Sequence, residues 1–331
     1  MKILFGPYML PAILVLTVLS GCGNVEPPSS RTNEETKNAS TGFPITLTDA
    51  LGRDVTFDAP PQRIISVAPK NTELIYFLGF DDRLVGVTTF CNYPPAAAKL
   101  DKIGGLTAQT INQELIVALN PDLILCSDRM HEPLIPQWEA LGLKAFVLGA
   151  ESLDAMYEEM QLLGRMMDDT EAADELIDSL SERVETIETG IAKIPADERP
   201  KLFYQVWDDP LMGAGPNSFI GQMMELTGGE NILSDVKEPY PYVAHEIVVE
   251  RNPDVIFAPT THSQEVNPEE IARQPAWKGI NAAKNKRIYL LDGDEVSRRG
   301  PRMIDALETM VALLYPERFG HYLDEGEGEP E

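Results

Sequence analysis

The sequence predicts an α/β protein made of two parallel-sheet lobes joined by one long helical spine. Three observations support this fold class: a long amphipathic segment near the middle of the chain, a similar helix–turn–strand unit on either side of it, and apolar strands that alternate with helices. The chain has 331 residues, which is long enough for two lobes that each bury a core.

The central segment, residues 170–194, has a single apolar face. Its apolar side chains recur at steps of three and four residues: Leu176, Leu180, Val184, Ile187, Ile191 and Ile194. Asp168 and Asp169 suit the N-cap and Pro195 ends the helix, while Gly190 costs about 1 kcal/mol relative to alanine. The pattern also fits a coiled coil, but the flanking sequence favours a spine lying across a globular protein.

The units that flank this spine are similar to each other. Glu114 precedes the Asn-Pro-Asp turn at 120–122, and Glu246 precedes the Asn-Pro-Asp turn at 252–254 by the same spacing. An apolar, β-branched run follows each turn. Each unit therefore predicts a short helix, a turn interrupted by proline and a buried strand. The repetition predicts one similar lobe on each side of the spine.

The first lobe is assigned to residues 43–165 and begins with a β-hairpin at 45–57. Asn71 is the expected N-cap of its first helix, which runs to Leu78. Four apolar strands alternate with helices, which predicts a parallel sheet: residues 64–68, 84–89, 122–127 and 144–148.

The spine is assigned to residues 166–199 and the second lobe to residues 200–320. The expected strands and helices of this lobe are residues 202–206, 218–226, 255–258, 287–291 and about 301–315. Residues 321–331 are expected to form an acidic tail rich in Gly and Glu.

Residues 1–22 are not expected to belong to the fold. An apolar stretch at 3–19 leads into the sequence LSGC, which ends at Cys22 and resembles the lipobox of bacterial lipoprotein signal peptides. The resemblance implies cleavage before Cys22 and a lipid on its sulfur; a plain secretory signal or a transmembrane anchor is the alternative. Residues 23–42 have almost no apolar content, which predicts a disordered tether.

Composition restricts the classes of partner. The formal net charge of −26 argues against nucleic acid, whose phosphates require a basic surface, and it is compatible with an exported protein. Cys91 and Cys126 remain beside the lipobox cysteine, and a disulfide between them is an open alternative. Two cysteines alone do not make a structural zinc site.

Six motifs occur in one order along residues 43–319. They are Asp49-Ala-Leu-Gly-Arg53 with Pro61-Gln-Arg-Ile64, Asn71-Thr-Glu-Leu74, Tyr93-Pro-Pro95, Asn120-Pro-Asp-Leu123, Gly228-Gly-Glu-Asn-Ile232 and Ser297-Arg-Arg-Gly-Pro-Arg302. Together they resemble the substrate-binding lipoproteins of ABC importers for cobalamin and ferric siderophores. The resemblance implies two α/β lobes bridged by one helix, with the ligand held in the cleft between them.

Ligand contacts are expected from loops at the carboxyl ends of the parallel strands. These loops are rich in aromatic residues, which suits a large, flat, partly apolar ligand. The candidate ligand-binding residues are Phe90, Tyr93, Trp207, Met212, Tyr240, Tyr242 and Arg298. For Phe90, Tyr240 and Arg298 the resemblance to cobalamin-binding members implies ligand contact. For Trp207 and Met212, packing in the core fits the sequence equally well.

Two departures from the family pattern leave the ligand open. Arg299 replaces a common proline, and its charge favours a carboxylate-rich or phosphate-bearing ligand. A tryptophan of the cobalamin-binding members, shortly after the Tyr-Pro-Pro loop, has no counterpart, because residues 103–105 are Ile-Gly-Gly. A corrinoid such as cobalamin is the leading ligand, with a ferric siderophore or haem as the alternative.

A bare metal ion is the competing class of ligand. His131 and His262 follow the two Asn-Pro-Asp strands at similar distances and can face each other to hold Zn²⁺, Mn²⁺ or a haem iron. Such a site needs further ligands, and two polar loop histidines are the simpler interpretation. Because the sequence has no nucleophile elbow, HExxH, P-loop or GxGxxG motif, we expect neither an enzyme nor a bound cofactor.

The resemblance also implies an ABC permease and its ATPase as partners. In the family one exposed glutamate of each lobe docks on a permease subunit, and Glu114 and Glu246 align with these positions. The alternative is that each carboxylate only complements the N-terminus of its helix. We expect a monomer, lipid-anchored at the cell membrane on its extracytoplasmic side.

Overall fold

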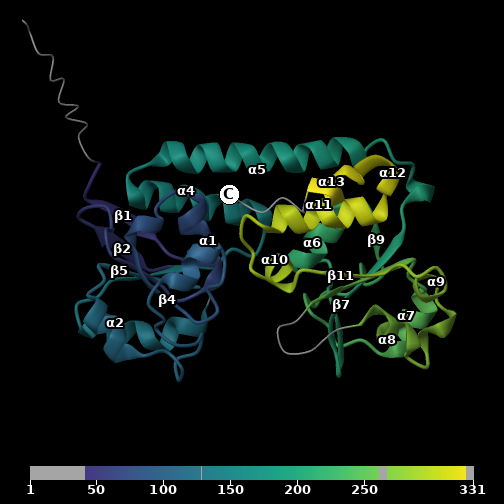
Figure 1. The fold of residues 1–331 in the computed structure, drawn as a ribbon, viewed down its shortest axis with the longest axis horizontal. Helices are drawn as coiled ribbons and strands as arrows, with labels where there is room; N and C mark the ends of the chain where they lie inside the picture. The colour runs from purple at the N-terminus through teal and green to yellow at the C-terminus, as the bar shows by residue number, and fades with distance from the viewer. Residues whose placement is uncertain (1–41, 128, 261–266, 326–331) are drawn as a thin grey trace, which may run out of the picture. The chain divides into compact units, whose positions relative to one another are not determined.

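Two β-sheets and one long helix form the framework of the computed structural model (Figure 1). The structure describes residues 42–127, 129–260 and 267–325, all within one compact unit, Thr41–Glu331. Cys22, the tether up to residue 41, His262 and residues 326–331 lie outside the described residues. The predicted fold class, α/β with two parallel-sheet lobes joined by one long helical spine, is confirmed, although the second sheet also contains one antiparallel strand.

The sheet of the first lobe, here called the N-lobe, is entirely parallel. Its strand order is β4 (Leu84–Val87), β3 (Ile64–Ser66), β5 (Leu123–Ser127) and β6 (Ala145–Leu148). The predicted hairpin is present as the antiparallel strands β1 (Ile45–Thr48) and β2 (Asp54–Phe57). The helices are α1 (Pro69–Phe77), α2 (Gln113–Leu119), α3 (Ile135–Ala140) and α4 (Leu153–Met167).

The sheet of the second lobe, the C-lobe, is mixed. Its order is β11 (Ile288–Leu291), β10 (Val255–Pro259), β7 (Lys201–Asp208) and β8 (Leu211–Gly213), and β9 (Glu230–Asn231) also pairs with β7. Strand β8 is antiparallel, because the chain turns back at Asp209-Pro210 directly after β7. The sequence did not predict this strand, since three residues are too few to establish a period of two.

Helices cover the C-lobe sheet and end the described chain. They are α6 (Phe219–Leu226), α7 (His245–Arg251), α8 (Pro268–Arg273), α9 (Asn281–Lys284), α10 (Gly293–Ser297), α11 (Met303–Leu314), α12 (Pro316–Phe319) and α13 (His321–Glu325). Short 3-10 helices complete the chain: Asp81–Arg83, Pro95–Lys99, Arg129–Leu134, Ala196–Glu198 and Trp277–Gly279. Residues 321–325, expected in an acidic tail, are helical as α13.

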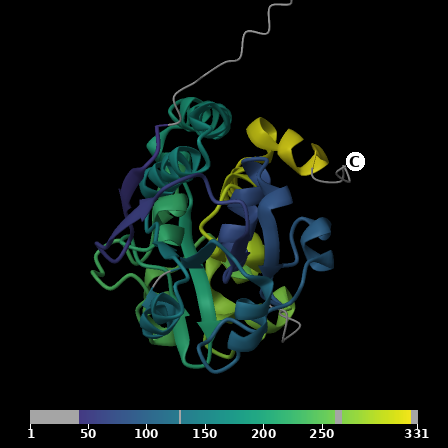
Figure 2. The same cartoon turned by 90° about the vertical axis from the view of Figure 1, so that its left-hand side faces the viewer.

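The spine is helix α5 (Thr170–Ile191), which packs against both α4 and α11 (Figure 1). In Figure 2 the two teal helices α4 and α5 are seen nearly end-on. The Asp169 side chain caps α5 by accepting from the Ala172 N–H at 3.1 Å, whereas Asp168 is the left-handed C-cap of α4. Leu176 of the predicted apolar face is partly buried. The other five side chains of this face are buried: Leu180, Val184, Ile187, Ile191 and Ile194.

Gly190 has a packing role that the sequence did not reveal. A Cβ at this position would collide with the ring of Phe319 in α12. The missing side chain of Gly190 therefore lets Phe319 pack closely against α5, and this contact accompanies the lower helix propensity of glycine. Gly164 in α4 plays the same part at the other end of the spine, since a Cβ there would lie 2.6 Å from the Cβ of Ala173.

Two expectations about the N-lobe change with the structure. Asn71 is not an N-cap: Ala68 takes that position, and the buried Asn71 amide donates to the Leu125 carbonyl at 3.1 Å. Cys91 and Cys126 are both buried, free thiols, and burial raises the pKa of Cys126. Among the described residues, no helix has both the length and the apolar content that crossing a bilayer requires.

Candidate functional site

A cavity of about 270 Å³ lies where N-lobe strands end and the C-lobe segment after β11 begins. We call it the cleft cavity. Residues following β3, β4 and β5 supply one wall, including Phe90, Met130 and His131. Helix α10 and the residues just after it supply the other wall, including Asp294, Arg298 and Arg299. The predicted position at the carboxyl ends of parallel strands therefore holds for this cavity.

Arg298 lines the cleft cavity, but its guanidinium is engaged with protein groups. It bonds Glu73 of α1 at 2.5 Å and Asp294 of α10 at 2.6 Å, and it also donates to the Phe90 carbonyl at 3.3 Å. The Glu73 side chain is 1% exposed, so this contact is a buried ion pair between the two lobes. A ligand at this arginine would have to share it with two carboxylates.

Arg302 completes what we call the Glu73 network, formed by Glu73, Arg298 and Arg302. Its Nε lies 3.1 Å from Glu73 Oε2, and its Nη1 lies 3.2 Å from Glu295. Burial, as the larger cause, and the charge of the neighbouring Asp292 together raise the pKa of Glu295 to about 7, against the opposing charge of Arg302. Sequence reasoning missed Glu73 as a site residue, although it stands in the motif Asn71-Thr-Glu-Leu74.

Tyr93 and Phe90 share a loop and lie in different surroundings. Phe90 is 50% exposed and lines the cleft cavity. The Arg302 guanidinium lies over the Tyr93 ring, with its Cζ 4.0 Å from the ring centroid. The Tyr93 ring also stacks with the ring of Phe77 in α1. Tyr93 therefore supports the Glu73 network and does not line the cavity.

Lys70 contributes a second buried charge to the cavity wall. Its ammonium pairs with Glu159 of α4 at 2.9 Å, and both side chains are buried. Glu159 also accepts from the Ala150 N–H at 2.6 Å. Because Glu159 is held by both the Lys70 ammonium and a backbone N–H, the pair fixes the start of α1 against α4.

Three of the predicted aromatic and Met residues come together in the C-lobe. Trp207 of β7 pairs with Met212 of β8, and Met212 pairs with Tyr242 across an isolated bridge. Directly opposed residues of antiparallel strands project to the same face. Trp207 is 46% exposed and Tyr242 is 71% exposed, so these side chains form an accessible surface, which we call the aromatic ribbon. For Trp207 this favours a surface role over core packing.

Tyr240 is close in sequence to the aromatic ribbon and interacts with the charge of Arg299, a residue of the cleft cavity. It lies two residues before Tyr242 and is 42% exposed. Burial of part of the ring raises the pKa of Tyr240, and the charge of Arg299, which lines the cavity, opposes that shift. Arg299 has a positive φ of 51°, and its Nη1 donates to the Ala150 carbonyl at 3.3 Å.

His131 is poorly arranged for metal binding. Its Nδ1 lies 3.1 Å from the Ser127 carbonyl and its Nε2 lies 2.8 Å from the Leu106 carbonyl, so both ring nitrogens face acceptors. A metal ligand needs a nitrogen lone pair, and a nitrogen that donates to a carbonyl has none to offer. His262 lies outside the described residues. Within the described ranges, no group of three or more His, Cys, Asp or Glu side chains is placed to hold a metal ion.

Glu114 and Glu246 lie away from the cleft cavity. Each is exposed in the first turn of its helix, α2 or α7. The residue before each glutamate contacts a fully buried tryptophan: Gln113 accepts from Trp138 Nε1 at 2.6 Å, and the His245 ring packs against Trp277 with centroids 5.5 Å apart.

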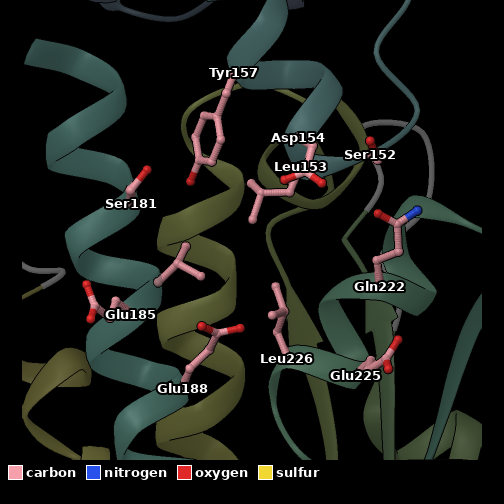
Figure 3. A pocket seen from close by; sticks show the side chains of 11 residues that line it. Ser152, Leu153, Asp154, Tyr157, Ser181, Glu185, Glu188, Gln222, Glu225 and Leu226 are labelled. Atoms are coloured by element: carbon pink, nitrogen blue, oxygen red, sulfur yellow. The ribbon is translucent and has the colours of Figure 1, made fainter. Parts of the chain in front are cut away.

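A larger cavity, of about 590 Å³, lies between α4, α5 and α6 (Figure 3). Its apolar lining includes Leu153 and Leu226, and its polar lining includes four carboxylates among neutral side chains: Asp154, Glu185, Glu188 and Glu225. Carboxylates in this number disfavour an anionic or apolar chelate. The smaller cleft cavity, which is lined by the exposed Phe90 ring and by Arg298 and Arg299, is the better candidate for the ligand site.

Two sheets with a spine helix between them and a cavity at the strand ends define a two-lobed binding protein. The family model described as periplasmic binding protein matches residues 64–295, and the chain belongs to this family. This membership confirms the resemblance drawn from the six motifs.

Individual relatives agree with this assignment. An uncharacterized ABC transporter substrate-binding lipoprotein of Bacillus subtilis is 31% identical over 312 residues, which cover 93% of this chain and 96% of the relative. A solved structure of a possible iron-binding periplasmic protein from Staphylococcus epidermidis is 31% identical with a TM-score of 0.69, covering 77% of this chain and 99% of that one. The periplasmic vitamin B12 binding protein of Vibrio cholerae is 28% identical with a TM-score of 0.64, covering 77% and 97%.

Proposed function

We propose that this protein is the substrate-binding component of an ABC importer and captures a metal chelate in the cleft. The observation that carries the proposal is the cleft cavity at the strand ends, which exposed Phe90 of the N-lobe and Arg298 of the C-lobe both line. The aromatic ribbon, which begins at the carboxyl end of β7, would supply further aromatic contacts from the C-lobe. Exposed aromatic side chains beside a cavity suit a large ligand with a flat, partly apolar face. The Bacillus subtilis relative, described as an ABC transporter substrate-binding lipoprotein, supports the same function.

A corrinoid is the ligand that we favour, and a ferric siderophore or haem is the alternative. The Vibrio cholerae relative is a vitamin B12 binding protein, while the Staphylococcus epidermidis relative is described as a possible iron-binding protein. The proposed contacts are Phe90, Trp207, Met212, Tyr240 and Tyr242. Arg298 and Tyr93 act mainly through the Glu73 network, which holds the two walls of the cleft together.

A bare metal ion is the less favoured ligand, because both ring nitrogens of His131 face backbone carbonyls. We propose no catalytic residue. Membership in a family of binding proteins is consistent with this, and the cleft side chains discussed above all have a binding or structural explanation.

The proposal includes the location and the partners. We propose an extracytoplasmic protein held at the membrane by a lipid on Cys22, working as a monomer with an ABC permease and its ATPase. Exposed Glu114 and Glu246 would dock on the two permease subunits. The name of the Bacillus subtilis relative, which includes the word lipoprotein, supports the anchor.

A binding panel tests this function. The purified chain is titrated with cyanocobalamin, haem and a ferric catecholate siderophore, and the dissociation constant is measured by calorimetry. We expect one chelate to bind, and we expect Phe90→Ala and Trp207→Ala each to weaken it about fivefold to tenfold through lost stacking. Leu141→Ala is the control, because Leu141 is 59% exposed and does not line the cleft cavity. Failure of all three chelates to bind would refute the proposed ligand class.

A further inference from the structure

Helices α2 and α7 repeat each other residue by residue in their exposure to solvent. Along Gln113–Leu119 and His245–Arg251 the seven positions follow the same sequence of partly buried, exposed, partly buried, buried, exposed, exposed and partly buried. Both helices end in a left-handed asparagine, with φ of 46° at Asn120 and 47° at Asn252. The two helices therefore present the same face to solvent.

Each of these faces carries an exposed valine after its glutamate. Val117 follows Glu114 by three residues and is 47% exposed, and Val249 follows Glu246 by three residues and is 39% exposed. Residues three apart on a helix are neighbours on one side. A single exposed apolar side chain needs no explanation, but the same one at the same place in both lobes does.

Contacts with the interior of each lobe fix the orientation of both helix faces. Gln113 and His245 each lie against a fully buried tryptophan, Trp138 or Trp277. After each helix an aspartate accepts from the backbone at the start of a strand: Asp122 from the Arg63 N–H at 2.9 Å, and Asp254 from the Lys201 N–H at 2.9 Å. Two lobes with different cores thus hold the pair of glutamate and valine in the same way.

We infer that Val117 and Val249 form the apolar half of a docking surface whose acidic half is Glu114 and Glu246. The inference rests on the proposed function, and the occupant is the pair of permease subunits. A partner built from two equivalent subunits offers the same recess twice, which explains why one chain presents the same face twice. Each recess should place a cation beside an apolar patch, because this is the complement of a carboxylate one turn before a valine.

The residues that differ between the two faces mark the edge of the shared surface. The position after each valine is Ala118 in α2 and Glu250 in α7, and both are exposed. Equivalent recesses cannot require a methyl group on one side and a carboxylate on the other. Glu250 therefore lies outside the repeated contact, and it supplies a matched control on the same helix.

The test uses the full lipid-anchored chain and an ABC permease–ATPase complex that supports chelate uptake with it, in proteoliposomes. The double variant Val117→Ser/Val249→Ser should associate with the complex about tenfold more weakly than wild type. Its dissociation constant for the chelate should not change. Glu250→Ala and Leu141→Ser are the controls and should associate normally.

The outcomes separate this inference from the proposed function. Normal association of the valine variant, together with lost association of Glu114→Ala/Glu246→Ala, would overturn the inference and leave the proposed docking standing. Normal association of both double variants would overturn the docking proposal itself. If the valine variant altered sedimentation of the chain alone and left permease association intact, the face would be a contact between copies of this chain, which also contradicts the inference.

Discussion

The two lobes are alike on helices α2 and α7, which carry the proposed docking glutamates, and different at the cleft. Helices α2 and α7 share their exposure pattern and their left-handed caps, and each lies against a buried tryptophan. At the cleft, the N-lobe contributes the buried acid Glu73 and a loop with Phe90, while the C-lobe contributes Arg298 and Arg302. The antiparallel strand β8, which carries Met212, has no counterpart in the N-lobe sheet.

This difference follows from what each surface is proposed to meet. A permease with two equivalent subunits requires the same contact twice, whereas a chelate between the lobes presents different chemical groups to each wall. The repeat is accordingly present on α2 and α7, the helices proposed to dock, and absent at the cleft. Substitutions on the two surfaces should accordingly affect different measurements.

The largest effect is expected at the cleft, from Glu73→Ala. The substitution leaves Arg298 and Arg302 without their shared buried carboxylate, and breaking a buried ion pair on one side costs about 3–5 kcal/mol. The free energy of unfolding is measured by denaturant titration. Glu269→Ala is the control, since its pair with Arg273 is about 70% exposed and should contribute less than about 1 kcal/mol. Equal losses for both variants would contradict the role of the Glu73 network.

The second effect is a pH dependence of the free energy of unfolding, and it comes from Glu295 beside the Glu73 network. Because the pKa of Glu295 is raised in the folded state from 4.5 to about 7, the folded chain binds this proton more tightly than the unfolded chain. The corresponding stability is present below about pH 4.5 and is lost as the pH rises through about 7. A shift of this size corresponds to about 3 kcal/mol.

Denaturant titrations of wild type and Glu295→Gln at pH 5, 6, 7 and 8 measure this effect. The stability of wild type relative to the variant should fall across the series, because only wild type carries the titrating carboxyl group. Parallel curves for the two proteins would show that Glu295 titrates near its ordinary value.

The smallest effect concerns the hydrogen bonding of the two buried tryptophans that lie against α2 and α7. Gln113 satisfies Trp138, but in the C-lobe Trp277 Nε1 and His245 Nδ1 are both buried without a hydrogen-bond partner among the described residues. Gln113→Leu should cost about 1–2 kcal/mol, because it strands the Trp138 N–H. His245→Gln should gain at most about 1 kcal/mol by giving Trp277 the acceptor that Trp138 has. Thermal unfolding of both variants should show a lower melting temperature for Gln113→Leu and an equal or higher one for His245→Gln. An unchanged melting temperature for Gln113→Leu would contradict the role of Gln113 as the acceptor for Trp138.

Sequence reasoning found the features that depend on local pattern. The apolar face from Leu180 to Ile194 predicted the spine, because steps of three and four residues determine a helical face wherever the helix packs. The repeat around Glu114 and Glu246 was visible because the Asn-Pro-Asp turn is strong local punctuation. The central strands were found for the same reason, since buried apolar runs are bounded by turn residues.

The features that were missed depend on long-range contacts. Arg298 looked like a ligand donor, because nothing near it in sequence reveals Glu73, which lies 225 residues earlier in the chain. Tyr93 looked like a cleft residue for the same reason, since its position under Arg302 is set by the docking of the two lobes. Strand β8 has only three residues, which is too short to show the alternating pattern of a strand. Its antiparallel pairing with β7 depends on the turn between them.

The measurement that tests the account most directly is ligand affinity and uptake in the same double variant, Glu114→Ala/Glu246→Ala. Both glutamates are exposed and lie outside the cleft cavity, so the dissociation constant for the chelate should equal that of wild type. Uptake through the reconstituted permease should be lost, and permease association of wild type should weaken as salt is raised, because exposed charges are screened. Uptake at the wild-type rate, or a loss of affinity equal to the loss of uptake, would contradict the separation of a repeated docking surface from an unrepeated ligand site.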